Sequence, residues 1–195
     1  MAPRQDDRRE RIAMLSLDDA RTAAESVGLP EVFAPLSVFR ILLRDPELAR
    51  AVAGQLQALL RGKHLDGRLR ELVIMRIGWA TGSVYEWTQH WRIARLMEIS
   101  EVDLLGVRDW RNHAGYGPAE RAVLAATDET LERGSIGDET WRACEANVGG
   151  PEALVELVVA IGNWQLFSSL LRTLQVPLEE GVPPWPPDGA VPEPR

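Results

Sequence analysis

The chain of 195 residues is 45% hydrophobic and 26% charged, which is ordinary for a soluble globular protein with a sizeable core. Its net charge of -7 argues against nucleic acid as a main partner, because phosphate binding needs a basic surface. There is no run of eighteen apolar residues and no apolar signal segment, so we expect a cytoplasmic protein without a membrane span.

The first half of the chain has the pattern of helices separated by short breaks. Residues 1–15 are expected to be a flexible N-terminus. Ser16 is placed to cap a first helix that ends before Gly28. Two more helices are predicted over residues 36–44 and 46–61, divided at Asp45-Pro46, where the proline suits the first turn. Asp66 or Gly67 then opens the helix that carries Glu71.

The second half continues in the same way. Helices are predicted from Ser83 to about Glu98, over residues 100–109, 119–133 and 138–146, and along a very apolar stretch over residues 151–175. Seven of the thirteen prolines lie from Pro177 onward and predict a tail that is extended rather than packed, with draping over the domain or a neighbour as the alternative. No segment alternates as a strand would. We therefore predict an all-α fold with a single domain over residues 16–176 and a Pro-rich tail over 177–195.

Proton-handling side chains are concentrated between Glu71 and His90. Glu86 and His90 lie one helical turn apart, in line with Ile93 and Met97, on a face that the pattern directs into the core. The opposite stripe of this helix is polar: Thr88, Arg92 and Arg95. Glu71 is likewise in line with apolar residues of its own helix. Two carboxylates and a histidine thus point where apolar side chains are expected.

The segment RLRELVIMRIGWATGSVYEWTQHWRIARLMEIS closely resembles the core motif of the carboxymuconolactone decarboxylase family, which also contains peroxidases of the alkyl hydroperoxide reductase D (AhpD) type. The peroxidase branch has a glutamate, eleven residues, and then Cys-x-x-Cys-x-x-x-His. Glu71 and His90 match this pattern, whereas Ser83 and Glu86 replace the two cysteines. The resemblance implies a multi-helix AhpD-like bundle that assembles as a homo-oligomer, namely a dimer, trimer or hexamer.

The missing thiols exclude the redox chemistry of the peroxidases, which needs a thiolate and a resolving cysteine. Cys144 is the only cysteine and lies in another element. What remains is acid–base chemistry, and the family's decarboxylase reaction implies how it would work. We predict a cofactor-independent decarboxylase, isomerase or lyase acting on a small carboxylated or lactone-like substrate.

The resemblance also suggests a role for each residue. His90 would be the acid, and Glu86 or Glu71 the base or orienting partner, because an apolar pocket raises the pKa of a carboxyl group toward the working pH. The hydroxyl of Tyr85 is placed to donate to a developing oxyanion or enolate. Three further residues are predicted to contact the substrate: Ser83, Trp87 and Arg76. Arg76, or alternatively Arg68, would pair with a substrate carboxylate. Nothing in the spacing is diagnostic of a metal, so no metal or cofactor is predicted.

Structural roles explain the same residues. Ser83-x-x-Glu86 matches a capping box, in which the serine accepts from a first-turn amide and the glutamate reaches back. His90 fits a core histidine bonded to Glu71 or Glu86, and Glu71 fits a buried ion pair with an arginine. Core packing is the simplest role for Trp79, Trp87 and Trp91, and His64 and His113 are expected to be solvated. The alternative function is a non-catalytic helical binding or assembly protein that retains the family fold.

Overall fold

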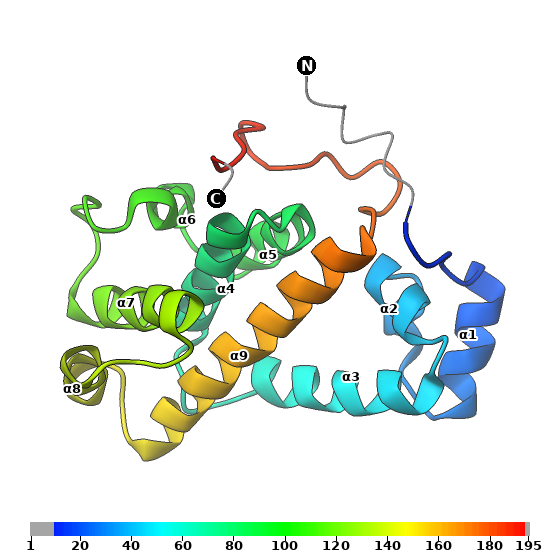
Figure 1. Ribbon diagram of the computed structural model, residues 1–195, viewed down its shortest axis with the longest axis horizontal. Coiled ribbons are helices and arrows are strands. Elements are labelled where there is room, and N and C mark those ends of the chain that lie inside the picture. The colour runs from blue at the N-terminus through cyan, green and yellow to red at the C-terminus, as the bar shows by residue number, and fades with distance from the viewer. Residues whose placement is uncertain (1–9, 194–195) are drawn as a thin grey trace. The chain divides into compact units, whose positions relative to one another are not determined.

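A computed structural model describes residues 10–193 (Figure 1). These residues form nine α-helices and two short 3-10 helices, with no strand among them. The all-α prediction is confirmed. The expected flexibility of residues 1–9 lies outside the described part of the chain.

The described residues fall into two compact units. The first contains the residues up to Ala58 together with Ser169–Val182. It holds α1 (Leu17–Ser26), η2 (Glu31–Phe33), α2 (Ser37–Leu42) and most of α3 (Pro46–Leu60). As predicted, Ser16 caps α1, and its hydroxyl accepts from the amide of Asp19 at 3.1 Å. A single domain over residues 16–176 stays a prediction.

The second unit contains Leu59–Ser168 and the tail from Pro183 onward. Its elements are α4 (Gly67–Thr81), α5 (Val84–Leu96), α6 (Glu101–Gly106), η3 (Val107–Asp109), α7 (Pro118–Arg133), α8 (Asp138–Asn147) and the part of α9 (Pro151–Leu174) up to Ser168. Helix α4 packs against α5, α7 and η3, and is therefore buried on nearly every side from Leu69 to Gly78. That position explains why its charged residues need partners inside the unit.

Helix α9 is the one helix of residues 10–193 that is long and apolar enough to cross a membrane. Half of its apolar window is buried inside the protein, which is what a core helix shows. Leu157, Ile161 and Trp164 belong to the buried side. Membrane insertion is therefore not indicated, and the very apolar helix predicted over residues 151–175 is confirmed.

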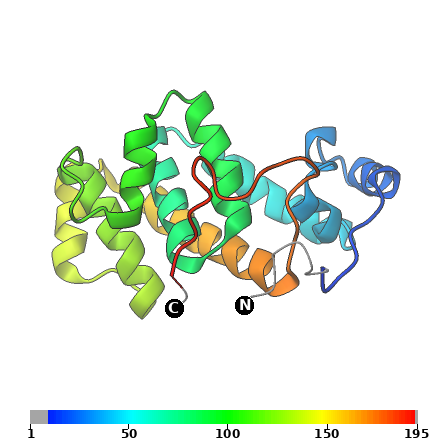
Figure 2. The ribbon, with the colours of Figure 1, turned by 90° about the horizontal axis from the view of Figure 1, so that it is seen from above.

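The tail from Pro183 to Glu193 contains no helix or strand, but it bends and turns over residues 184–188, where the amide of Gly189 donates to the carbonyl of Trp185 at 2.8 Å. The expectation that it is extended rather than packed is therefore wrong at these residues, and the tail drapes over the second unit instead. Trp185 is only 4% exposed, and its ring lies against those of Trp79 and Trp87, with centroids 6.0 and 6.1 Å away. Its amide donates to Thr88 Oγ1 at 3.2 Å, and the carbonyl of Pro186 accepts from Trp87 Nε1 at 2.7 Å. Thr88, on the stripe predicted to be polar, is 1% exposed because the tail covers it. The tail crosses the helices in Figure 2.

Candidate active site

Three of the four residues predicted to be catalytic are brought together in the second unit. Glu71 comes from α4, and Glu86 and His90 come from α5. Nδ1 of His90 lies 2.8 Å from Oε2 of Glu71, and Nε2 of His90 lies 3.6 Å from Oε2 of Glu86. The three residues are 0%, 4% and 7% exposed, in sequence order. The prediction that polar groups occupy the core faces of both helices is confirmed for these positions.

The turn between α4 and α5 accounts for this meeting. Gly82 ends α4 with a φ of 71°, a left-handed conformation that glycine adopts without a steric penalty. Helix α5 begins two residues later and packs against α4. Gly78 lets the helices approach closely, since a Cβ at that position would lie 3.0 Å from the backbone nitrogen of Trp87. The close packing brings Glu71 within hydrogen-bond distance of His90.

Glu71 has a second charged partner. Nε of Arg70, also buried, lies 3.5 Å from Oε1 of Glu71. A buried carboxylate is costly unless it is paired and hydrogen-bonded, and Arg70 and His90 supply those partners. Both contacts considered in the structural explanation, a histidine bonded to Glu71 and an arginine paired with it, are present.

Trp164 on α9 completes the surroundings of His90 and was missed by the sequence analysis. Its Nε1–H donates to Nε2 of His90 at 3.1 Å, and the two rings meet edge to face with centroids 5.7 Å apart. The residues are 74 positions apart. Nothing in the sequence distinguishes this tryptophan from others on apolar helices, so only the packing of α9 reveals its role.

The electrostatics of the group favour a proton shared near neutral pH. Burial raises the pKa of Glu86 to about 7, and the charge of Glu71 adds to this rise while that of His90 opposes it. Burial acts to lower the pKa of His90, but the charge and hydrogen bond of Glu71 outweigh it and leave that pKa raised. A carboxyl group that titrates near neutrality can give up or accept a proton under physiological conditions.

The remaining predicted residues of this segment are buried: Ser83, Tyr85 and Trp87. Ser83 occupies the N-cap position of α5, but its side chain makes no capping hydrogen bond, and its buried Oγ has no hydrogen-bond partner among the described residues. The capping-box explanation is therefore wrong. Trp87 is 0% exposed beneath Trp79 and the tail, which supports its packing role.

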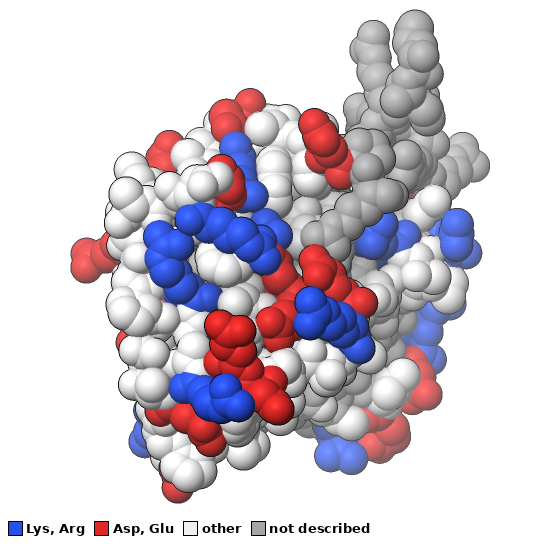
Figure 3. Space-filling model, turned by 60° about the vertical axis from the view of Figure 1, so that its left-hand side comes forward, with Lys and Arg blue, Asp and Glu red and all other residues white. Residues whose placement is uncertain are grey.

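Neither arginine considered for a substrate carboxylate is available in this structure. Arg76 is held by Asp128, with Nε–Oδ1 and Nη2–Oδ2 distances of 2.6 and 3.0 Å. Arg68 bonds Glu120 and lies 3.0 Å from Asp103. The expectation for Arg76 is corrected, because its guanidinium already has a buried carboxylate partner. On the face shown in Figure 3, acidic and basic side chains are interspersed.

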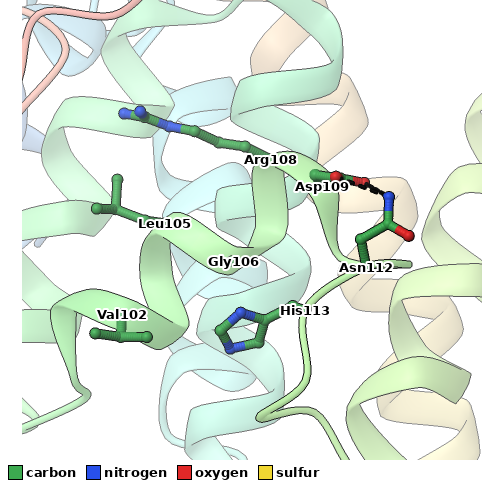
Figure 4. Close-up of a pocket in the computed structure, with 7 residues that line it drawn as sticks. All are labelled: Val102, Leu105, Gly106, Arg108, Asp109, Asn112 and His113. Atoms are coloured by element: carbon green, nitrogen blue, oxygen red, sulfur yellow. Dashed lines mark hydrogen bonds between the residues drawn. The ribbon is translucent and has the colours of Figure 1, made fainter.

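Two surface pockets lie away from the predicted site. One, of about 420 Å³, lies in the second unit and is shown in Figure 4; its lining is Val102, Leu105, Gly106, Arg108, Asp109, Asn112 and His113. His113 was expected to be solvated but is largely buried against Tyr116, with ring centroids 4.3 Å apart. The other, of about 430 Å³, is lined in the first unit by residues between Leu15 and Pro46. Neither pocket includes a predicted site residue.

Within residues 10–193, no three His, Cys, Asp or Glu side chains are arranged to hold a metal ion.

Comparison with known proteins supports the family resemblance. Residues 46–129 match the model of the carboxymuconolactone decarboxylase family. The predicted resemblance to this family is confirmed, and the matched range includes Glu71, Glu86 and His90. No curated protein matches the sequence significantly.

Solved structures show that the fold is of the AhpD type. An uncharacterized peroxidase-related protein from Ralstonia eutropha JMP134, described as an alkylhydroperoxidase AhpD core, has a TM-score of 0.71 at 19% identity, covering 88% of this chain and 93% of that one. A cysteine-to-alanine variant of the debrominase Bmp8, in complex with 2,3,4-tribromopyrrole, has a TM-score of 0.69 at 17% identity, covering 88% and 95%. An uncharacterized peroxidase-related protein from Silicibacter sp. TM1040 has a TM-score of 0.67 at 12% identity, covering 83% of each chain.

Proposed function

We propose that this protein is a cofactor-independent acid–base enzyme of the decarboxylase, isomerase or lyase type. Its substrate is a small carboxylated or lactone-like molecule. The observation that carries the proposal is the buried group of Glu71, His90 and Glu86, in which the pKa of Glu86 is raised to about 7. Such a group holds a transferable proton at neutral pH in surroundings that exclude water.

The state of Cys144 supports thiol-independent chemistry. It is buried on α8, its thiol faces the carbonyl of Ala122 at 3.6 Å, and burial raises its pKa to about 11. A thiol with a raised pKa is a poor nucleophile, because the thiolate is the reactive form. Neither catalytic cysteine position of the peroxidases holds a cysteine in this chain.

In a decarboxylation, the electron pair of the broken carbon–carboxylate bond passes into the unsaturated system of the substrate, and one proton is then added to carbon. Glu71 orients His90 through the 2.8 Å contact at Nδ1. Glu86 and the Nε2 side of His90 form the proton-transferring pair. Positioned proton transfer of this kind contributes about 10²–10⁴ in rate. We further propose that the protein is cytoplasmic and that it forms a homo-oligomer. Light scattering on the purified chain would measure the oligomeric state.

Burial favours a second candidate, a non-catalytic helical binding or assembly protein. Glu71, Glu86 and His90 are all nearly inaccessible, and both described pockets lie elsewhere. In this case the polar group has only a structural role, and the site residues influence stability without influencing any turnover.

A turnover screen with unsaturated lactone acids separates the two candidates. The enzyme proposal expects loss of substrate absorbance, a rate that falls as the pH rises above about 7, and a loss of about 10²–10⁴ in kcat for Glu86→Gln. Glu47→Gln, the same substitution at a side chain that is 72% exposed, is the control and should retain the parent rate. If the parent shows no turnover, with or without a ligand-induced rise in melting temperature, the non-catalytic candidate is supported.

A further inference from the structure

The indole of Trp164 determines which atom of His90 can carry a proton. An indole Nε1–H is a donor only, and it lies 3.1 Å from Nε2 of His90. Nε2 must therefore accept, which it can do only when it carries no proton. The proton of the neutral imidazole then lies on Nδ1, facing the carboxylate of Glu71 at 2.8 Å. The two neighbours act on opposite ring nitrogens and favour the same tautomer.

We propose that Trp164 is a positioning residue that keeps Nε2 of His90 unprotonated, so that Glu86 holds the proton used in the reaction. This inference rests on the proposed function for its catalytic meaning. It replaces His90 by Glu86 as the acid and adds a residue to the site from a third helix. Nε2 accepts from the indole of Trp164, and a protonated Glu86, whose Oε2 lies 3.6 Å away, remains as the neighbouring proton carrier. An imidazolium would instead place its own N–H opposite the N–H of Trp164.

The groups facing His90 come from each of the three surrounding helices. Helix α4 contributes Glu71 and the more distant charge of Arg70, which act in opposite directions on the imidazolium. Helix α5 contributes Glu86, whose carboxyl group titrates near neutrality. Helix α9 contributes the indole of Trp164, which is uncharged but opposes protonation of Nε2. Removing the indole N–H should therefore let the imidazolium persist to higher pH.

Nitrogen NMR on the full-length protein tests the assignment directly. In the parent, above the titration of His90, we expect Nδ1 protonated, Nε2 unprotonated, and a scalar coupling across the hydrogen bond between Nε2 and Nε1 of Trp164. In Trp164→Phe the coupling is lost and the pKa of His90 rises by roughly half to one unit, as expected for the loss of one neutral hydrogen bond. With only three histidines in the chain, His64 and His113 serve as internal references.

Trp91→Phe is the matched control, because Trp91 is also buried and is next to His90 in the chain. It should leave the coupling and the His90 titration as in the parent. If Trp164→Phe fails to fold, 3-benzothienylalanine at this position preserves the shape of the ring and removes only the N–H. A protonated Nε2 in the parent above the titration of His90, or an unchanged titration in both Trp164 variants, would overturn the inference.

The spectroscopic test of the proton assignment and the turnover test of the enzyme proposal can fail independently of each other. Finding the coupling and the pKa rise without any turnover would reject the enzyme proposal and leave the proton assignment intact. Finding turnover with Nε2 protonated would support the enzyme proposal and return the acid role to His90.

Discussion

Arg76 and Asp128 join α4 to α7 through two parallel hydrogen bonds of 2.6 and 3.0 Å in the core of the second unit. Burial acts to raise the pKa of Asp128, but the bonds and charge of Arg76 outweigh it and leave that pKa lowered. We predict that Arg76→Gln lowers the free energy of unfolding by about 3–5 kcal/mol, because it leaves a buried carboxylate without its main partner. Urea unfolding of the purified variant measures this.

Arg111→Gln is the control for that measurement. Arg111 bonds the same carboxylate at 3.0 Å, but its side chain is 61% exposed, so we expect a loss below about 1 kcal/mol. If Arg76→Gln is as stable as the parent and only weakens substrate binding, the original prediction of a substrate-binding role would be restored.

Glu86 gives the protein a specific pH dependence of stability. Its pKa is raised in the folded state from 4.5 to about 7, so the stabilisation linked to its proton is complete below pH 4.5 and is lost as the pH rises through about 7. The pKa of His90 is also raised in the folded state, so its contribution to stability is likewise lost as the pH rises above 6.5. We predict that the free energy of unfolding of the parent falls by on the order of 3 kcal/mol between pH 4.5 and about 7 because of Glu86, and that Glu86→Gln abolishes this fall. Unfolding curves of parent and variant at matched pH values provide the comparison.

The comparison reports the titration of Glu86 together with its effect on His90, because the charge of Glu86 also helps to raise the pKa of His90. Parallel stability curves from pH 4 to 8 would show that Glu86 does not hold its proton in the folded state. A variant that gains relative stability with rising pH is the expected outcome.

Ser83 should be dispensable for the stability of α5. Its hydroxyl is buried and has no hydrogen-bond partner among the described residues, so Ser83→Ala removes an unpaired polar group. We expect the free energy of unfolding to stay the same or rise slightly. Thermal unfolding followed by circular dichroism measures the change.

Ser100→Ala gives the contrasting result for a true cap. The hydroxyl of Ser100 accepts from the amide of Asp103 at 3.0 Å at the start of α6, so its loss should cost about 1 kcal/mol. Equal losses at Ser83 and Ser100 would revive the capping box that the structure argues against.

The tail contributes to stability mainly through Trp185. We predict that Trp185→Ala lowers the free energy of unfolding by about 3 kcal/mol, because it empties the space beside Trp79 and Trp87. The same change should alter the tryptophan fluorescence of the folded protein. Val191→Ala, at a position 62% exposed, is the control and should change neither property.

The sequence predicted most of the secondary structure because local signals are strong here. Caps such as Ser16, breaks such as Gly28 and Asp45-Pro46, and helical spacing of apolar residues all lie within a few positions of each other. The contact between Glu71 and His90 could also be predicted from the sequence, since only a tight turn separates their helices. The contact of Trp164 with His90 and the Arg76–Asp128 pair could not be predicted, because they depend on how distant helices pack.

The tail also has a long-range contact that the sequence could not predict. Its proline content predicted an extended backbone, but residues 184–188 bend and turn, and composition says nothing about the burial of a single tryptophan. Trp185 finds its place only because Trp79, Trp87 and Thr88 have already formed a surface for it. Ser83 failed as a cap for a related reason: the spacing of a capping box is present, but Glu86 is turned toward His90.

The separation in sequence between the partners of α5 has a consequence for the order of folding. Glu71 and His90 are 19 residues apart, His90 and Trp164 are 74 apart, and Trp87 and Pro186 are 99 apart. Contacts between distant residues require costly loop closure and tend to slow folding. During refolding, the α4–α5 hairpin can form early, whereas the indole of Trp164 and the carbonyl of Pro186 arrive with the last long-range contacts. The nitrogen coupling at His90 would therefore report complete folding, and helix content alone would not.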